Sequence, residues 1–160
     1  MTQQTLDGLK SLLRRDEGDL EKLTGVLATE HQALAGNDMT ALEQATNEKD
    51  ELLKAVRERA RRKIRLLAQL GYSPDSGESP GTFLERVCAD AGLIEQWHST
   101  RKRLEHCQHR NSVNGRILGH LQRRLARISD IIRGADRNQS LYGSGGEAHS
   151  LNPRHVLASA

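Results

Sequence analysis

The residues best suited to metal chemistry lie in the segment Glu105–His109 (EHCQH), which holds two imidazoles and one thiol. Imidazole nitrogens and thiolate sulfurs are ligands that zinc prefers, but zinc requires them to converge on one point. The helical register described below places Cys107 on an inward-facing position and His106 and His109 on the outer face. We therefore expect no metal site here, and the sequence indicates no other cofactor.

A second candidate is the basic run Val56–Arg65 (VRERARRKIR), whose charge is typical of a surface that binds nucleic acid. Stacking on bases requires aromatic side chains, and these make up only 2% of the chain. Acidic segments also flank the run. We favour a solvated helix face and do not expect nucleic-acid binding.

Signatures of catalysis and of membrane insertion are both missing from the sequence. It contains no glycine-rich phosphate loop and no nucleophile elbow, so we do not expect an enzyme. No stretch approaches the roughly 20 apolar residues of a membrane span, and the N-terminus does not resemble a secretory signal. The expected location is the cytoplasm, where Cys88 and Cys107 would stay reduced.

Two asparagines, Asn111 and Asn114, lie in the middle of a segment whose periodicity is otherwise helical, although asparagine is a poor helix former. Both lie in the row of apolar positions, the seam, along which this helix is expected to pack against two others. We therefore expect a polar layer inside the helical bundle near Thr46 and Lys49, opposite Thr24–Leu27. Its expected role is to fix the register of helix pairing, as seam asparagines commonly do. Direct contact with a ligand is the alternative.

Three long helices must position these residues, because apolar residues recur at alternating steps of three and four. The turn Gly36–Asp38 separates the first seam, with seven leucines in nine places, from the second. A short turn between equal helices predicts an antiparallel hairpin. The inward positions are Leu6, Leu9, Leu13, Asp16, Leu20, Leu23, Leu27, Glu30 and Leu34 in the first helix, Met39, Leu42, Thr46, Lys49, Leu53, Val56, Ala60, Lys63, Leu67 and Leu70 in the second, and Leu93, Trp97, Thr100, Leu104, Cys107, Asn111, Asn114, Leu118, Leu121, Leu125, Ile128 and Ile132 in the third.

The expected fold class is all-α, a long antiparallel helical hairpin with a third long helix in a coiled-coil-like three-helix bundle. The capping-box spacing of Thr82 and Glu85 predicts a short intervening helix, and Gly134 predicts the end of the last one. We assign residues 1–134 to the bundle and the Gly/Ser-rich residues 135–160 to a flexible tail. The predicted helices cover about 3–35, 38–70, 82–91 and 93–133.

The second half of the third long helix carries more apolar residues than one seam needs, since Ile117 and Ile131 lie on one flank of it. Packing of three helices against one another explains such a wide stripe. A groove for an amphipathic helix from another protein explains it as well. The two interpretations are compatible if the third helix packs loosely on the hairpin.

The sequence resembles the FlgN family of flagellar export chaperones. The most specific part of the resemblance is the motif Asn111-x-x-Asn114-Gly115-x-Ile117-Leu118. The run Leu118–Ile132 and the segment Leu141–Gly146 (LYGSGG) support it. Length and the N-terminal helical hairpin also fit, whereas the leucine heptads alone occur in any coiled coil.

The resemblance implies a non-enzymatic cytoplasmic chaperone. Such chaperones bind the C-terminal amphipathic helical segments of hook-associated proteins at the hook–filament junction, keep them unassembled and deliver them to the type III export gate. Tyr142 resembles the family's contact to the cytoplasmic domain of the gate. A structural coiled-coil protein that self-associates is the alternative, and a homodimer is compatible with both. The cargo-binding residues that the resemblance implies are Ile117, Leu118, Leu121, Leu125, Ile128, Ile131 and Ile132.

Overall fold

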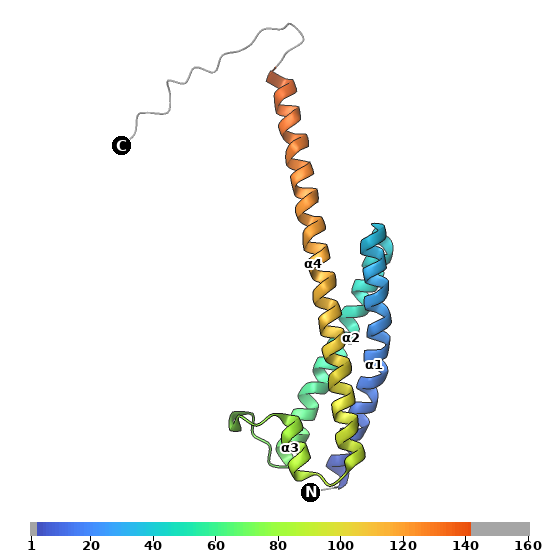
Figure 1. Cartoon of the computed structure of the whole chain (residues 1–160), viewed down its shortest axis with the longest axis vertical. Coiled ribbons are helices and arrows are strands. Elements are labelled where there is room, and N and C mark those ends of the chain that lie inside the picture. The colour runs from blue at the N-terminus through green and yellow to red at the C-terminus, as the bar shows by residue number, and fades with distance from the viewer. Residues whose placement is uncertain (1–2, 142–160) are drawn as a thin grey trace, which may run out of the picture. The chain divides into compact units, whose positions relative to one another are not determined.

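Helices are the regular secondary structure of residues 3–141, which are the residues that the computed structural model describes, with side chains as far as residue 134. The all-α class predicted from the sequence is confirmed over this range. No helix in it combines the length and the hydropathy that a bilayer crossing requires. The elements are α1 (Gln3–Gly36), α2 (Met39–Gln69), the short 3-10 helix η1 (Pro74–Ser76), α3 (Pro80–Val87) and α4 (Ala91–Leu141), and Figure 1 shows them along the chain.

The chain divides into two compact units, residues 1–117 and residues 118–160. The first unit holds α1, α2, η1, α3 and the part of α4 that ends at Ile117. Within the described residues, the second unit consists of the rest of α4 alone.

The turn between α1 and α2 reverses the chain, as predicted, but it has two residues instead of three, because Gly36 is the last residue of α1. Asn37 adopts a left-handed conformation with φ +53°, which asparagine tolerates better than most residues. The backbone N–H of Asp38 donates to the Ala33 carbonyl at 3.0 Å, which closes the end of α1. The Asp38 carboxylate accepts from the Ala41 N–H at 3.0 Å and caps the start of α2.

The hairpin is antiparallel, and α4 runs parallel to α1 in the first unit. In the pairs that join α1 to α2, the residue number rises on one helix as it falls on the other, since Glu30 bonds to Lys49 whereas Asp16 bonds to Arg59. In the pairs that join α1 to α4, the residue numbers rise together on both helices. On α1, Glu17, Leu20 and Leu27 accept hydrogen bonds from Gln96, Cys107 and Asn114 of α4, respectively.

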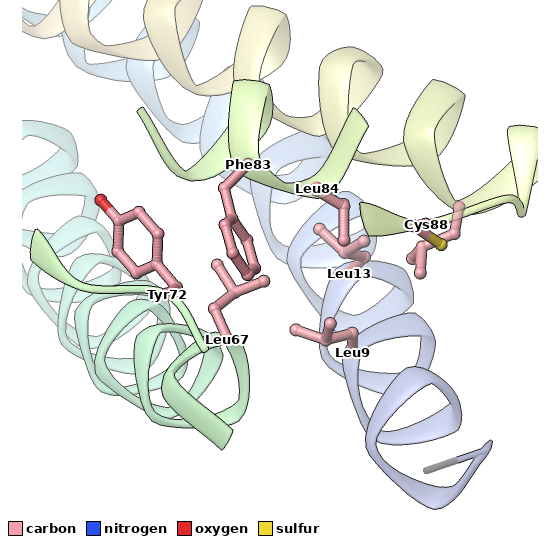
Figure 2. Close-up of a cluster of buried hydrophobic side chains, with 8 residues drawn as sticks. Leu9, Leu13, Leu67, Tyr72, Phe83, Leu84 and Cys88 are labelled. Carbon is pink, nitrogen blue, oxygen red and sulfur yellow. The ribbon is translucent and has the colours of Figure 1, made fainter. Parts of the chain in front are cut away.

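Two apolar clusters make the core of the first unit. All nine predicted inward positions of α1 are buried except Leu6, which is half-buried. Two residues of α2 that were predicted to face inward are exposed, namely Met39, at the first residue of the helix beside the turn, and Ala60. One cluster contains Leu9, Leu13, Leu67, Tyr72, Phe83, Leu84, Cys88 and Leu93, and Figure 2 shows that it joins α1 to the end of α2 and to α3. The other contains Leu20, Leu23, Leu27, Val56 and Cys107, with Leu52, Leu53 and Leu104 packed against it.

The end of α2 depends on a glycine. Gly71 has φ +99°, in the left-handed region, and its N–H donates to the Ala68 carbonyl at 3.0 Å. The N–H of Tyr72 donates to the Leu67 carbonyl at 3.0 Å, so the last turn of α2 is closed by two bonds. The ring of Tyr72 then meets Phe83 edge-on, with centroids 5.3 Å apart (Figure 2).

The short helix α3 differs from its predicted bounds at both ends. It begins at Pro80, because Ser79 and not Thr82 is the cap, and the Ser79 hydroxyl accepts from the Thr82 N–H at 3.2 Å. Glu85, expected in a capping box, lies 2.6 Å from the imidazole of His98 instead. The helix ends at Val87 rather than at residue 91.

The start of α4 is fixed by Asp90, whose carboxylate accepts from the Leu93 N–H at 3.0 Å and pairs with the Lys10 ammonium at 2.5 Å. The bond from Lys10 is the main cause of a lowered Asp90 pKa, and the same bond raises the pKa of Lys10. Because the Asp90 pKa is lower in the folded chain than in the unfolded chain, the ionised carboxylate stabilises the fold at a pH above the ordinary carboxyl pKa. This stabilisation is lost as the pH falls through the lowered pKa.

Helix α4 continues through Gly134, where the sequence predicted its end, and reaches Leu141. Glycine ends a helix when it adopts a left-handed conformation, and Gly134 is not among the described glycines with positive φ. Inside a helix it costs only about 1 kcal/mol relative to alanine. Residues 135–141, assigned to the flexible tail, belong to α4 instead, and the rest of that predicted tail, residues 142–160, lies outside the described residues.

We expect Gly71→Ala to lower the free energy of unfolding by about 1–2 kcal/mol, because an L side chain is strained at this φ. The measurement is urea unfolding followed by circular dichroism. Gly25→Ala is the matched control, because Gly25 lies in α1 with no atom near the added Cβ, and it should raise stability by roughly 0.5–1 kcal/mol. Equal effects of the two changes would contradict the left-handed cap.

Candidate functional site

Asn114 ties α4 to α1 from a buried position. Its side chain is 3% exposed, and its amide nitrogen donates to the Leu27 carbonyl at 2.9 Å and to the Glu30 carboxylate at 2.8 Å. Its amide oxygen lies 3.0 Å from Nδ1 of His31, which donates in the tautomer protonated there. The amide therefore uses its oxygen and both its N–H donors in three bonds, all of them to α1.

Glu30 extends this polar layer to α2, where its carboxylate pairs with the Lys49 ammonium at 2.5 Å. The sequence placed Lys49 opposite residues 24–27, about one turn short of Glu30. Side chains on a helix lean toward its N-terminus, so the long Lys49 side chain reaches toward the hairpin turn. A polar layer thus forms near the predicted height. Thr46 lies outside it, because its hydroxyl donates to the Leu42 carbonyl of its own helix at 2.8 Å.

A second ionic layer lies around Asp16, farther from the hairpin turn than the layer at Glu30. This carboxylate is 1% exposed and accepts from Arg59 at 2.6 Å and from Lys63 at 2.5 Å. Burial lowers the pKa of Arg59, but its hydrogen bonds to Asp16 and Asp19 outweigh burial and raise it. The basic run 56–65 was expected to be a solvated face, but two of its residues, Arg59 and Lys63, lie in this layer. The feature of the sequence that could have predicted these ionic layers is that Asp16 and Glu30 occupy positions of the leucine seam.

Asn111 differs from Asn114 although both lie on the predicted seam. It is half-buried and lines a cavity of about 40 Å³ beside Cys107 and Lys49. Among the described residues its side chain has no hydrogen-bond partner. Only one of the two predicted asparagines therefore bonds into the polar layer.

The EHCQH segment is arranged as its register predicts, with Cys107 buried and both His106 and His109 exposed. The Cys107 thiol lies 3.4 Å from the Thr24 hydroxyl and 3.6 Å from the Leu20 carbonyl. In the part of the chain that the structure describes, no three histidine, cysteine or acidic side chains are grouped so as to hold a metal ion.

Burial along α4 changes character after Asn114. Four positions spaced seven residues apart are at most 4% exposed, and they are Leu93, Thr100, Cys107 and Asn114. In the second unit the predicted inward residues Leu125, Ile128 and Ile132 are 66%, 51% and 55% exposed. Leu118 is less exposed, at 37%, and Leu121 is half-buried. Most of this apolar surface is therefore open.

We call the set Leu118, Leu121, Leu125, Ile128, Ile131 and Ile132 the α4 stripe. Five of them recur at steps of three and four, so they lie along one side of the helix, and Ile131 widens that side. The described part of the second unit is a single helix, so it offers these side chains no second element to pack on. Ile117, also predicted to bind cargo, is half-buried at the end of the first unit.

A family model described as FlgN protein matches residues 1–150. The chain belongs to the FlgN family. It is therefore a flagellar export chaperone for hook-associated proteins, and the family is non-enzymatic and cytoplasmic. A comparison with curated proteins and one with solved structures each gave no significant match.

The predicted gate contact of this FlgN protein, Tyr142, lies outside the described residues. Apart from Tyr142 and the half-buried Ile117, the predicted site residues fall into three groups. Asn114 is a buried structural contact, Asn111 borders a small cavity, and the α4 stripe is an apolar surface.

We expect Asn114→Ala to lower the free energy of unfolding by about 2–3 kcal/mol, because it removes bonds to a buried carbonyl and to the buried Glu30 carboxylate. The matched control is Asn111→Ala, which removes no such bond and should change stability by no more than about 0.5 kcal/mol. Urea unfolding of both variants measures the difference. Losses of the same size would show that the polar layer does not depend on Asn114.

Proposed function

We propose that the α4 stripe binds the C-terminal amphipathic helical segment of a hook-associated protein and keeps that segment unassembled until delivery to the type III export gate. The observation that supports this proposal is the exposure of large apolar side chains on a helix that has no partner element in its own unit. Contiguous exposed apolar surface commonly marks a site of protein interaction. Family membership supplies the class of partner.

Burial of the stripe supplies the driving force for binding. Covering one leucine or isoleucine side chain fully contributes about 1.5–3 kcal/mol, so a few such contacts suffice for a complex. Ordering a flexible cargo segment costs roughly 2–5 kcal/mol of the gross interaction energy. The remainder is moderate, which allows release at the gate. This exchange of one apolar partner for another requires no nucleotide.

Charge near the stripe favours a cargo helix with acidic residues. Residues 118–134 contain four arginines, Arg123, Arg124, Arg127 and Arg133, and one acidic residue, Asp130, which gives a net charge of +3 with histidine neutral. All five side chains are exposed. A positive surface speeds association with a negatively charged partner and makes the rate dependent on salt.

Self-association through the same stripe is the second candidate. A copy of this helix would cover the apolar side chains equally well, as in other coiled coils. The two candidates differ in their response to cargo. A chaperone complex takes up a C-terminal peptide of a hook-associated protein, whereas a structural oligomer keeps its mass when that peptide is added.

We expect Leu125→Asp to weaken binding of this peptide at least tenfold, since it places a charge in the centre of the buried contact. Ala126→Asp is the matched control, because the neighbouring residue is also exposed but lies off the stripe. Isothermal titration calorimetry measures both, and circular dichroism checks that both remain helical. Tight binding by a folded Leu125→Asp variant would place the cargo elsewhere.

We further propose that Tyr142 contacts the cytoplasmic domain of the export gate, as the resemblance of the LYGSGG segment implies. We expect Tyr142→Ala to lose gate binding in a pull-down while binding of the cargo peptide is retained. A chain that lacks residues 147–160 is the control and should keep both activities. Loss of both activities in Tyr142→Ala would refute a division of labour between the stripe and the tyrosine.

A further inference from the structure

Helix α2 carries a group of exposed cations that no described residue neutralises. We call this group the α2 basic face, and its members are Lys54, Arg57, Arg61, Arg62 and Arg65. Among residues 3–134, whose side chains the structure describes, none of the five makes a hydrogen bond or an ion pair. The other two cations of this segment, Arg59 and Lys63, turn toward α1 and pair with Asp16.

The α2 basic face lies along one side of the helix. Its members follow one another at steps of three and four residues, except that Arg62 directly follows Arg61. The first and the last lie eleven residues apart, so the row is about 17 Å long at roughly 1.5 Å per residue. One exposed carboxylate, Glu58, lies among the five cations, which leaves a net charge of +4.

The part of α2 nearer the hairpin turn has the opposite charge. Its one cation, Lys49, already pairs with Glu30. A surface that attracts the α2 basic face repels this acidic part, so the end of the hairpin that lies away from the turn would approach it. The exposed acidic residues of this part are Glu43, Glu48, Asp50 and Glu51.

No large apolar side chain accompanies the charges of the α2 basic face. The exposed large apolar residues in the described part of the chain are Met39 and members of the α4 stripe, and none lies in residues 54–65. Protein interfaces draw most of their energy from a few well-packed residues at a buried centre, and exposed ion pairs alone contribute little. The α2 basic face therefore suits a partner that attracts it by charge over a broad area.

Nucleic acid and an anionic membrane surface both offer such an array of negative charges. Proteins hold single-stranded nucleic acid by stacking aromatic side chains on the bases in addition to charge. Residues 54–65 contain no aromatic residue. Lipid headgroups require charge alone, and a cluster of about four to eight lysines and arginines on a helix commonly binds them. The composition of this face thus favours the membrane.

We propose that the α2 basic face binds the anionic headgroups of a phospholipid bilayer, with the helix lying on the surface and not inserted in it. Each lysine or arginine near such a surface strengthens binding about fivefold, and salt weakens the attraction. The contact uses neither the α4 stripe nor cargo, so it is separate from the proposed function.

Co-sedimentation of the full chain with phospholipid vesicles tests the proposal. The probe is a vesicle made of equal parts of phosphatidylcholine and phosphatidylglycerol, and a vesicle of phosphatidylcholine alone is the comparison. We expect the chain to bind the mixed vesicle and not the neutral one at about 0.15 M salt, where the Debye length is about 8 Å. Binding should disappear at about 1 M salt, where this length is about 3 Å.

A double variant tests the assignment to α2. Arg61→Gln with Arg65→Gln removes two charges and no bond, so the affinity for the mixed vesicle should fall about thirtyfold. The matched control, Lys102→Gln with Arg103→Gln, removes the same charge from exposed, unpaired positions of α4 and should change the affinity by no more than about threefold.

Circular dichroism checks the fold of both double variants. Both should also bind the C-terminal peptide of a hook-associated protein as the native chain does, which separates this proposal from the proposed function. The proposal is overturned if the native chain does not bind the mixed vesicle, or if the two double variants lose equal affinity. Retention of the chain by immobilised DNA or polyglutamate, but not by the vesicle, would overturn it as well.

Discussion

The apolar side of a long helix is stable in water only when other apolar surface covers it. Helix α4 has such a cover in the first unit, whereas the described part of the second unit contains no other element. As far as Asn114, every seventh residue from Leu93 onward is buried. From Leu118 onward the same periodicity continues, but its leucines and isoleucines are mostly exposed. A helix that keeps an apolar stripe after its own core ends is suited to take the missing partner from another chain.

The buried charges of the hairpin serve a different purpose from the stripe. A leucine seam by itself permits pairings shifted by one heptad, because every layer looks like the next. Asp16 and Glu30 replace leucine at two positions of the α1 seam and find their cations on α2 only in one pairing. Asn114 applies the same condition to α4, since its bonds to Leu27 and Glu30 require one height along α1. We infer that these layers specify a single arrangement, at some cost in stability relative to an apolar core.

The hairpin could be predicted from the sequence because its signals are local. The alternation of three and four residues fixed the buried side of α1, and Gly36–Asp38 fixed the turn. The difference between Asn111 and Asn114 could not be predicted, because it depends on which groups of α1 lie opposite each of them. The end of α4 was placed too early, because a glycine marks a helix end only when its backbone turns left-handed. A cavity in the first unit, which Thr100 lines, is formed by four segments that are distant in the sequence, so no local pattern of the sequence predicts it.

Hydrogen exchange of the backbone amides of α4 can be compared between the free chaperone and its mixture with a C-terminal peptide of a hook-associated protein. We expect slow exchange in residues 93–114 of the free protein and fast exchange in residues 118–134, because a helix without tertiary packing opens readily. Exchange in residues 118–134 should slow strongly when the peptide binds. Equally slow exchange in both parts of a free monomer, unchanged by peptide, would contradict this expectation.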